Sequence, residues 1–229
     1  MRTAERVKRR VKTDDDRRLV LYWVTWEGYE KFLDAAEGTT IRINYDRGTL
    51  EMIVPSFDHE AWRRSIDRLI LALCVVLGVD FRGAGSTTLR RKDLARGLEP
   101  DESYYIQNID AVRNIHDLDL TIIPPPDLVL EVERSRGTSV ERMELYAALR
   151  VPEVWRFDGS ETVMCHLREG DYEIVTESVA FPGLTVERVT AFLAVAMPMD
   201  EEVALFRFAS QWVKKNILPL RRKKHGRKS

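Results

Sequence analysis

Two segments of the chain begin with a Pro-Asp step and continue in an extended pattern, residues 99–106 (EPDESYYI) and 126–133 (PDLVLEVE). Side chains of a strand alternate between two faces, so Asp127, Glu131 and Glu133 share one face of the second segment while leucine and valine line the other. Three carboxylates placed in this way repel one another, and burying them is costly unless a positive charge lies between them. We expect this face either to be open to water or to hold a cation.

The first segment carries Asp101 immediately after its proline. If the two segments are neighbouring strands of an antiparallel sheet, Asp101 and Glu131 converge. Two or three convergent carboxylates form an oxygen-ligand site suited to Mg²⁺ or Mn²⁺. Such an ion stabilises charge on a phosphate and lowers the pKa of a bound water. The alternative is that these acids are exposed and pair with the arginines of residues 134–142.

Basic residues directly precede the first of these segments. The stretch LRRKDLAR (residues 89–96) carries three arginines and a lysine. A basic loop beside an acidic metal site suits a phosphodiester substrate, because the phosphates must be attracted past the carboxylates. A solvated loop is the alternative. The ends of the chain are also basic, and such ends often contact nucleic acid or another acidic surface, with a solvated tail as the alternative.

The composition is that of one large domain with polar extensions. The chain has 229 residues, of which 44% are hydrophobic and 32% charged. Its net charge of −1 does not by itself predict any class of binding partner. We expect a basic N-terminal extension (1–18), a core domain (19–205), and the end of a helix with a basic tail (206–229). Two cysteines do not make a disulfide framework, and no segment resembles a signal peptide or a membrane span. The expectation is a soluble, cytoplasmic protein without a membrane partner.

Periodicity along the chain predicts an α/β or α+β fold. Apolar spacing predicts a helix over 24–36 with Thr25 as N-cap, and a long helix over 56–78 that ends at Gly78. The other expected elements are a hairpin (40–54), three extended segments (86–92, 99–106 and 126–133), a helix (138–149) capped by Thr138 or Ser139, a strand (152–158), a hairpin (161–178) and helices (186–193 and 200–213). Strands flanked by helices, without a Gly-rich phosphate loop, argue against a doubly wound fold.

The order of these motifs resembles the Uma-type family of putative restriction endonucleases, which is part of the PD-(D/E)xK nuclease superfamily. The resemblance rests on GLEPDESYYI, PDLVLEVE, a helix ending in Tyr146 and VPEVWRFD, in that order, and covers about residues 24–178. It implies a restriction-endonuclease-like core, in which helices flank a central mixed sheet, with an N-terminal helix and hairpin and a C-terminal helical extension. It also implies a Mg²⁺- or Mn²⁺-dependent endonuclease acting on nucleic acid, with DNA as the expected substrate, and homodimers are common in the superfamily.

The resemblance also assigns roles to individual residues. Asp101 matches the first catalytic acid of the family, Glu131 matches the acid of the (D/E)xK element, and Asp127 matches the second Pro-Asp step. Glu60, at the start of the long helix, matches a position where the superfamily often adds a carboxylate ligand. We therefore expect these four residues at the metal. His59 is expected to be a polar residue of the helix N-terminus, with a metal or phosphate contact as the alternative.

The lysine of the superfamily is absent from both positions where it is expected. Glu133 stands two residues after Glu131, and Arg142 stands four residues before Tyr146, where many relatives carry lysine. We expect Glu133 to support the catalytic site and Arg142 to take the place of the lysine. Arginine supplies charge, but its pKa is too high for a base and its planar fork differs from an ammonium group.

Two functions from different classes follow. The first is a metal-dependent endonuclease that hydrolyses phosphodiester bonds, with Asp101, Glu131, Glu133 and Arg142 in the catalytic site. The second is a catalytically inactive relative that binds nucleic acid or a protein partner, and the missing lysine motivates it. A glycosidase using the paired acids is a third and weaker option, because the Pro-Asp segments and the basic loop fit phosphate chemistry better.

Overall fold

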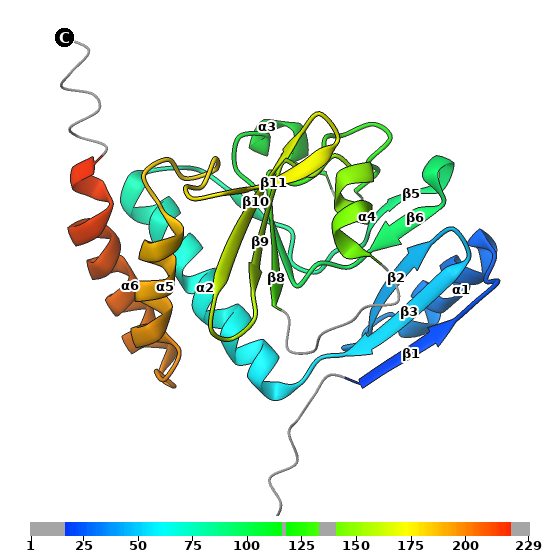
Figure 1. The fold of residues 1–229 in the computed structure, drawn as a ribbon, viewed down its shortest axis with the longest axis horizontal. Helices are drawn as coiled ribbons and strands as arrows, with labels where there is room; N and C mark the ends of the chain where they lie inside the picture. The colour runs from blue at the N-terminus through cyan, green and yellow to red at the C-terminus, as the bar shows by residue number, and fades with distance from the viewer. Residues whose placement is uncertain (1–16, 116–117, 133–140, 221–229) are drawn as a thin grey trace, which may run out of the picture.

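The structure is a computed structural model that describes residues 17–115, 118–132 and 141–220. These residues form two β-sheets with helices packed on each of them (Figure 1). The expected mixed α and β class is confirmed. Glu133, the predicted caps Thr138 and Ser139, and most of the basic ends (1–16 and 221–229) lie outside the described residues.

The first sheet is antiparallel and combines segments from both sides of the long helix. Its order is β1-β3-β2-β6-β5. The strands are β1 (Arg17–Leu21), β2 (Arg42–Asp46), β3 (Thr49–Val54), β5 (Leu89–Arg91) and β6 (Arg96–Leu98). β2 and β3 form the expected hairpin, and its turn residues Arg47 and Gly48 both have positive φ, as a tight two-residue turn requires. The basic stretch 89–96 therefore belongs to this sheet and not to the sheet of the carboxylates.

Helix α1 (Trp26–Ala36) packs on the first sheet. It begins at the predicted cap, where the Thr25 hydroxyl accepts a hydrogen bond from the Gly28 N–H over 3.1 Å. Tyr29 and Tyr45 stack with their ring centroids 4.8 Å apart, and Trp26 lies edge-on to both rings. The first sheet thus has a small aromatic core of its own.

The second sheet is mixed and contains both Pro-Asp segments. Its order is β11-β10-β9-β8-β7-β4, and β8 and β9 are its parallel pair. The strands are β4 (Arg82–Gly83), β7 (Glu102–Tyr105), β8 (Leu128–Val132), β9 (Glu153–Phe157), β10 (Thr162–Arg168) and β11 (Asp171–Val175). β7 and β8 are antiparallel neighbours, which is the arrangement that the convergence of their acids requires. The expected strand over 152–158 and the hairpin over 161–178 are present as β9, β10 and β11.

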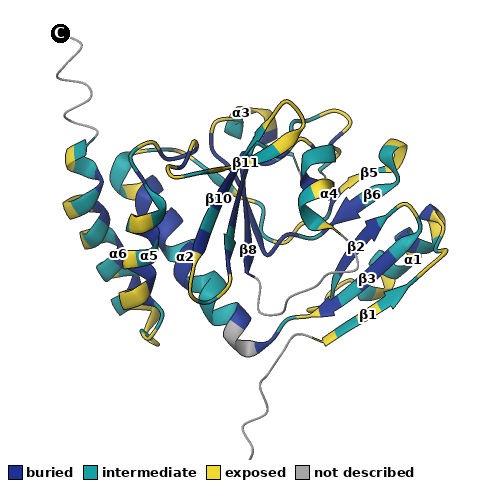
Figure 2. Cartoon of the chain, in the orientation of Figure 1, coloured by how far each residue is buried: buried dark blue, intermediate teal, exposed yellow. Residues whose placement is uncertain are grey.

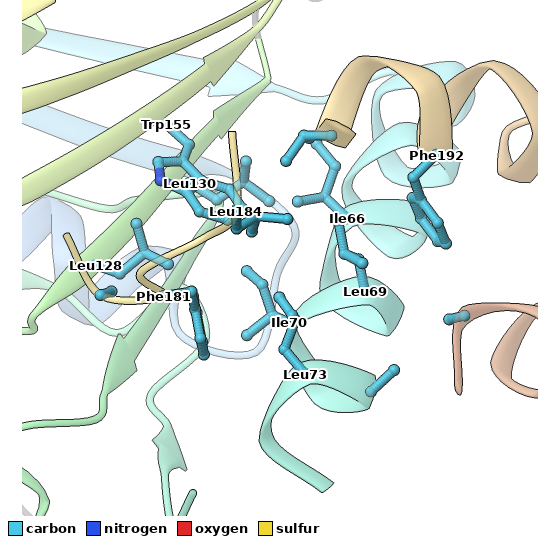
Figure 3. Packing of buried hydrophobic residues seen from close by; sticks show 14 of the residues in the cluster. Ile66, Leu69, Ile70, Leu73, Leu128, Leu130, Trp155, Phe181, Leu184 and Phe192 are labelled. Atoms are coloured by element: carbon cyan, nitrogen blue, oxygen red, sulfur yellow. The ribbon is translucent and has the colours of Figure 1, made fainter. Parts of the chain in front are cut away.

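Helices cover both faces of the second sheet (Figure 1). They are α2 (Phe57–Leu77), α5 (Val186–Ala196) and α6 (Glu202–Asn216) on one side and α4 (Arg142–Ala148) on the other. Leu128 and Leu130 pack against α2 in the larger core (Figure 3), whereas Val129 packs with Leu145 and Tyr146 of α4. Because both faces are covered, every residue of β8 is buried (Figure 2).

Some element boundaries differ from the expectation. The helix expected over 138–149 begins at Arg142, with Glu141 at the N-cap position and without a side-chain cap. The last helix continues to Asn216, and its Ala209 and Val213 belong to the larger core. α2 ends at Gly78 in the left-handed conformation, as predicted. Short helical turns connect strands at Lys92–Leu94 and at α3 (Ile109–Val112). Over the described ranges, every helix is too short or too polar to cross a bilayer.

Candidate functional site

Asp101 and Glu131 meet across the β7–β8 pair. The register places Glu102 opposite Leu130, and Asp101 and Glu131 are the next residues of the two segments. Residues directly opposite each other in an antiparallel pair point to the same face. Asp101 Oδ2 accepts a hydrogen bond from the Val132 N–H over 2.7 Å, which fixes the position of this carboxylate. Each acid is only 3% exposed, so the structure brings two carboxyl groups together in the interior.

The cation on this face of β8 belongs to the protein itself. Arg142 Nη2 lies 2.5 Å from Glu131 Oε1 and also donates to the carbonyl of Glu99 over 3.1 Å. The Tyr146 hydroxyl donates to the same oxygen of Glu131. Arg142 and Tyr146 are four residues apart and therefore share one face of α4. This face turns toward β8, so α4 both covers Glu131 and supplies its charge partner.

Asp101 has two basic partners that come from other elements. His59 Nε2 lies 3.0 Å from Asp101 Oδ1, and Arg42 Nε lies 3.5 Å from the same oxygen. His59 belongs to the first turn of α2, where its N–H donates to the hydroxyl of the N-cap Ser56 over 3.4 Å. Arg42 is the first residue of β2. Both sheets and the long helix therefore meet at this carboxylate.

Burial and neighbouring charges shift the pKa values of Asp101 and Glu131 in opposite directions. Burial raises the pKa of Asp101, but the hydrogen bond from His59 and the charges of His59, Arg142 and Arg42 outweigh it and hold the pKa below its usual value. For Glu131 burial is again the largest effect. Together with the negative charge of Asp101 it outweighs Arg142 and Tyr146 and raises the pKa to about 7. Paired acids with separated pKa values are typical of functional sites.

Glu60 lies at the rim of this group and not in direct contact with the acid pair. Its side chain is 41% exposed, and its Oε1 lies 3.5 Å from Arg42 Nη2. Its other oxygen binds Arg63 Nη2 over 2.9 Å. Glu60 is thus connected to Asp101 through the guanidinium of Arg42.

Asp127 lies at the other end of β8 and has a different set of partners. Its Oδ2 accepts hydrogen bonds from the N–H groups of Ile106 and Asn108 over 2.7 and 2.9 Å. The Asn108 side-chain amide donates to its Oδ1 over 2.6 Å. Asp127 therefore holds the loop that follows β7, and the structure does not bring it to Asp101 and Glu131.

Sequence reasoning missed three partners of the acid pair. Tyr146 had a signal, because it stands four residues after Arg142 on a predicted helix. His59 was placed at the helix N-terminus, which is correct, but its contact with Asp101 depends on how α2 lies against β7. Arg42 had no local signal, since its strand belongs to the other sheet.

Asp101 and Glu131 offer carboxylate oxygens, the ligand type that Mg²⁺ and Mn²⁺ prefer. His59 Nε2 beside them is the hydrogen-bond donor that lowers the pKa of Asp101 and is therefore not a ligand in this arrangement. The raised pKa of Glu131 means that further positive charge would stabilise its ionised form. Within the described residues, no group of three or more Asp, Glu, His or Cys side chains is arranged so that it could hold a metal ion. The metal roles of Asp101, Glu131, Glu60 and Asp127 therefore stay predictions, as does the role of Glu133.

Comparison with known proteins adds two findings. The model of the Uma2 family, described as "Putative restriction endonuclease", matches residues 26–199, a range that includes every residue of the site described above. A solved structure of a putative nuclease belonging to DUF820 from Anabaena variabilis is similar over 79% of this chain and 98% of that one, with 14% sequence identity and a TM-score of 0.48. A search of curated proteins gave no match.

Proposed function

The chain belongs to the Uma2 family of putative restriction endonucleases, whose model spans most of its length, and we propose that it is a metal-dependent endonuclease that hydrolyses phosphodiester bonds in DNA. Family membership supports a nuclease-like function. The observation that carries the finer proposal is the pair of buried acids, Asp101 and Glu131, on neighbouring strands.

In this proposal Asp101 and Glu131 would hold Mg²⁺ or Mn²⁺, and the ion would supply positive charge at the phosphate and lower the pKa of a bound water. The chain prepares both acids for that role. His59 and Arg42 keep Asp101 ionised, and the Val132 N–H fixes its orientation. The pKa of Glu131 near neutrality means that binding of the ion and loss of the proton are coupled.

On the family resemblance, Arg142 stands at the position where many relatives carry a lysine, and its guanidinium holds Glu131 in position. Burial lowers the pKa of Arg142, but the charges of Glu131, Tyr146 and Asp101 outweigh burial and raise it above the ordinary value. The guanidinium therefore stays protonated and cannot accept a proton from water. Its contribution is positional and electrostatic.

The proposal is tested by incubating supercoiled plasmid and labelled oligonucleotides with the protein in Mg²⁺, Mn²⁺ or EDTA. Cleavage is expected with either ion and not with EDTA. Asp101→Asn and Glu131→Gln remove one charge each at nearly constant shape, and each should slow cleavage by about a hundredfold or more. Asp110→Asn is the matched control, because the Asp110 side chain is 87% exposed and pairs with Arg113 instead. Cleavage that survives both site substitutions would remove the mechanism.

A catalytically inactive relative that binds nucleic acid is the second candidate. Arg142 favours it, because a permanently charged guanidinium occupies the place of the lysine next to Glu131. Binding of DNA without cleavage in either ion would support this function. Pairing into a homodimer, which would let two sites cut both strands, is a separate proposal that light scattering in solution tests.

A further inference from the structure

The chain crosses from the first sheet to the second between β6 and β7, and Glu99 lies at this crossing. β6 ends at Leu98 and β7 begins at Glu102, so Glu99, Pro100 and Asp101 connect the two strands. The contacts that hold Glu99 therefore also set where Asp101 enters the second sheet.

The side chain of Glu99 replaces a backbone partner in the ladder between β2 and β6. The register places Tyr45 opposite Gly97, and continuing it by two residues brings Ile43 opposite Glu99. In a continued antiparallel ladder the Ile43 N–H would bind the backbone carbonyl of Glu99. It donates instead to the side-chain oxygen Oε2 of Glu99 over 2.8 Å. The Glu99 N–H in turn donates to the side-chain oxygen of Asn44 over 3.4 Å.

This exchange leaves the backbone carbonyl of Glu99 for Arg142. Arg142 Nη2 donates to that carbonyl over 3.1 Å, and the same nitrogen lies 2.5 Å from Glu131 Oε1. If the ladder continued, the Ile43 N–H would compete with Arg142 for the carbonyl. The next residue, Pro100, has no N–H and cannot extend the ladder. The carboxylate of Glu99 thus allows its own peptide group to hold the partner of Glu131.

The same carboxylate fixes the strand that carries Arg42. Ile43 directly follows Arg42, whose Nε lies 3.5 Å from Asp101 Oδ1. The other oxygen of the Glu99 side chain accepts a hydrogen bond from the Thr88 hydroxyl over 2.9 Å, so each oxygen has a donor. Glu99 is therefore connected to a basic partner of each site acid.

We propose that Glu99 is a positioning residue of the candidate site. Its side chain takes the place of a backbone acceptor, so that two guanidinium groups, those of Arg42 and Arg142, stay against the acid pair. Glu99 acts through these neighbours by its hydrogen bond to Ile43, and its own charge is not required. This inference rests on the proposed function, since it names a residue that prepares the same two acids.

The test compares Glu99→Ala with Glu99→Gln in two measurements, the kinetics of oligonucleotide cleavage in Mg²⁺ and calorimetric titration of the full chain with Mg²⁺. Glu99→Ala removes the acceptor of the Ile43 N–H, and we expect kcat and Mg²⁺ affinity each to fall by about tenfold. KM should change by less than about twofold, because Glu99 does not touch the substrate.

Glu99→Gln is the variant that should rescue the site. Its amide oxygen can accept from the Ile43 N–H, and its amide N–H can donate to the Thr88 hydroxyl, which also accepts. We therefore expect kcat and Mg²⁺ affinity within about threefold of the wild type.

Two further variants separate positioning from other effects. Thr88→Ala removes the second hydrogen bond of the same carboxylate and keeps the first, so kcat should change by less than about twofold. Val189→Ala weakens the core beneath α5, and at a temperature where the variant is folded it should leave kcat and Mg²⁺ affinity within about twofold. Urea unfolding establishes which variants are folded, and Glu99→Met replaces Glu99→Ala if the alanine variant is not.

Three results would overturn the inference. Wild-type values for Glu99→Ala would show that the side chain positions nothing. Equal losses for Glu99→Gln and Glu99→Ala would show that the charge of Glu99 is what matters. Losses in Val189→Ala as large as those in Glu99→Ala would reduce the effect to stability.

Failure of the proposed function gives a different result. A wild type that binds Mg²⁺ but cleaves no DNA overturns the endonuclease, and the Mg²⁺ affinities of the variants then decide the role of Glu99. A wild type that neither binds Mg²⁺ nor cleaves overturns both.

Discussion

Arg142 Nη2 lies 2.5 Å from Glu131 Oε1, and both side chains are nearly buried. Glu131 is one of three acids that the sequence places on one face of this strand, and its negative charge is balanced by the guanidinium of Arg142 from α4. A buried ion pair is weak evidence for stability, because the cost of removing two charges from water can exceed their attraction. Its position beside Asp101 makes it a candidate for function, since charge close to two acids controls which of them is ionised.

Arg142→Lys restores the residue type that the superfamily uses, and we expect it to raise metal-dependent cleavage by about tenfold, because a compact ammonium group can approach a water or phosphate that the planar fork cannot. The measurement is the initial rate of oligonucleotide cleavage in Mg²⁺. Arg91→Lys, on the surface of the other sheet, makes the same exchange and should leave the rate unchanged. A lower rate for Arg142→Lys than for the wild type would show that the guanidinium itself is required.

Stability should fall as the pH rises through the range in which Glu131 titrates. Its pKa is about 7 in the folded protein against a usual 4.5, so in this window the folded state keeps a proton that the unfolded chain has lost. The free energy of unfolding therefore decreases with pH between about 4.5 and 7. Asp101, whose pKa is lowered, loses its stabilising contribution only as the pH falls below its usual value.

Glu131→Gln isolates this effect, because the amide does not titrate. Urea unfolding between roughly pH 5 and 8 should show the variant gaining stability relative to the wild type as the pH rises. A difference that stays constant across this range would contradict a raised pKa for Glu131.

The turn between β9 and β10 depends on a glycine. Gly159 has φ 94°, and a Cβ at this position would lie 2.2 Å from the ring of Trp62. Trp62 packs edge-on against Phe157, which limits its movement. We expect Gly159→Ala to lower the free energy of unfolding by about 2–4 kcal/mol through strain and overpacking.

Gly170→Ala is the control for this prediction. Gly170 has a similar φ of 103°, but a Cβ there meets no atom within 4 Å, so only the backbone is strained. The expected loss is about 1 kcal/mol. Equal losses for the two variants in urea unfolding would show that Trp62 moves aside without cost.

The strands of the carboxylates could be predicted because their signals are local. Alternation along Leu128–Val132 identifies the strand and sorts its side chains into two faces. The pairing of β7 with β8 has no local signal: the sequence gives it only as the condition under which Asp101 and Glu131 converge, and the structure fulfils that condition. The Uma2 family match agrees with the resemblance that these motifs carry.

Apart from its β2–β3 hairpin, the first sheet could not be predicted, because its other strands pair across long stretches of sequence. β2 precedes α2 in the sequence and β6 follows it, yet the two strands pair, with Tyr45 opposite Gly97. Neither the hydrophobic periodicity nor the β-propensity of the two segments indicates that they pair with each other. The contact between Arg42 and Asp101 depends on this pairing, so it had no sequence signal.

Asp127 shows that two residues on the same face of a strand need not belong to the same site. It shares a face with Glu131, but the two are four residues apart along the strand, a separation of about 13 Å at ~3.3 Å per residue. Because its carboxylate binds the backbone of Ile106 and Asn108, Asp127→Asn should lower the free energy of unfolding by about 1–3 kcal/mol. Calorimetric titration with Mg²⁺ should give unchanged affinity for Asp127→Asn and lost affinity for Asp101→Asn. Equal losses of affinity in the two variants would show that Asp127 is a metal ligand. In that case β8 and the loop after β7 would have to rearrange when the ion binds.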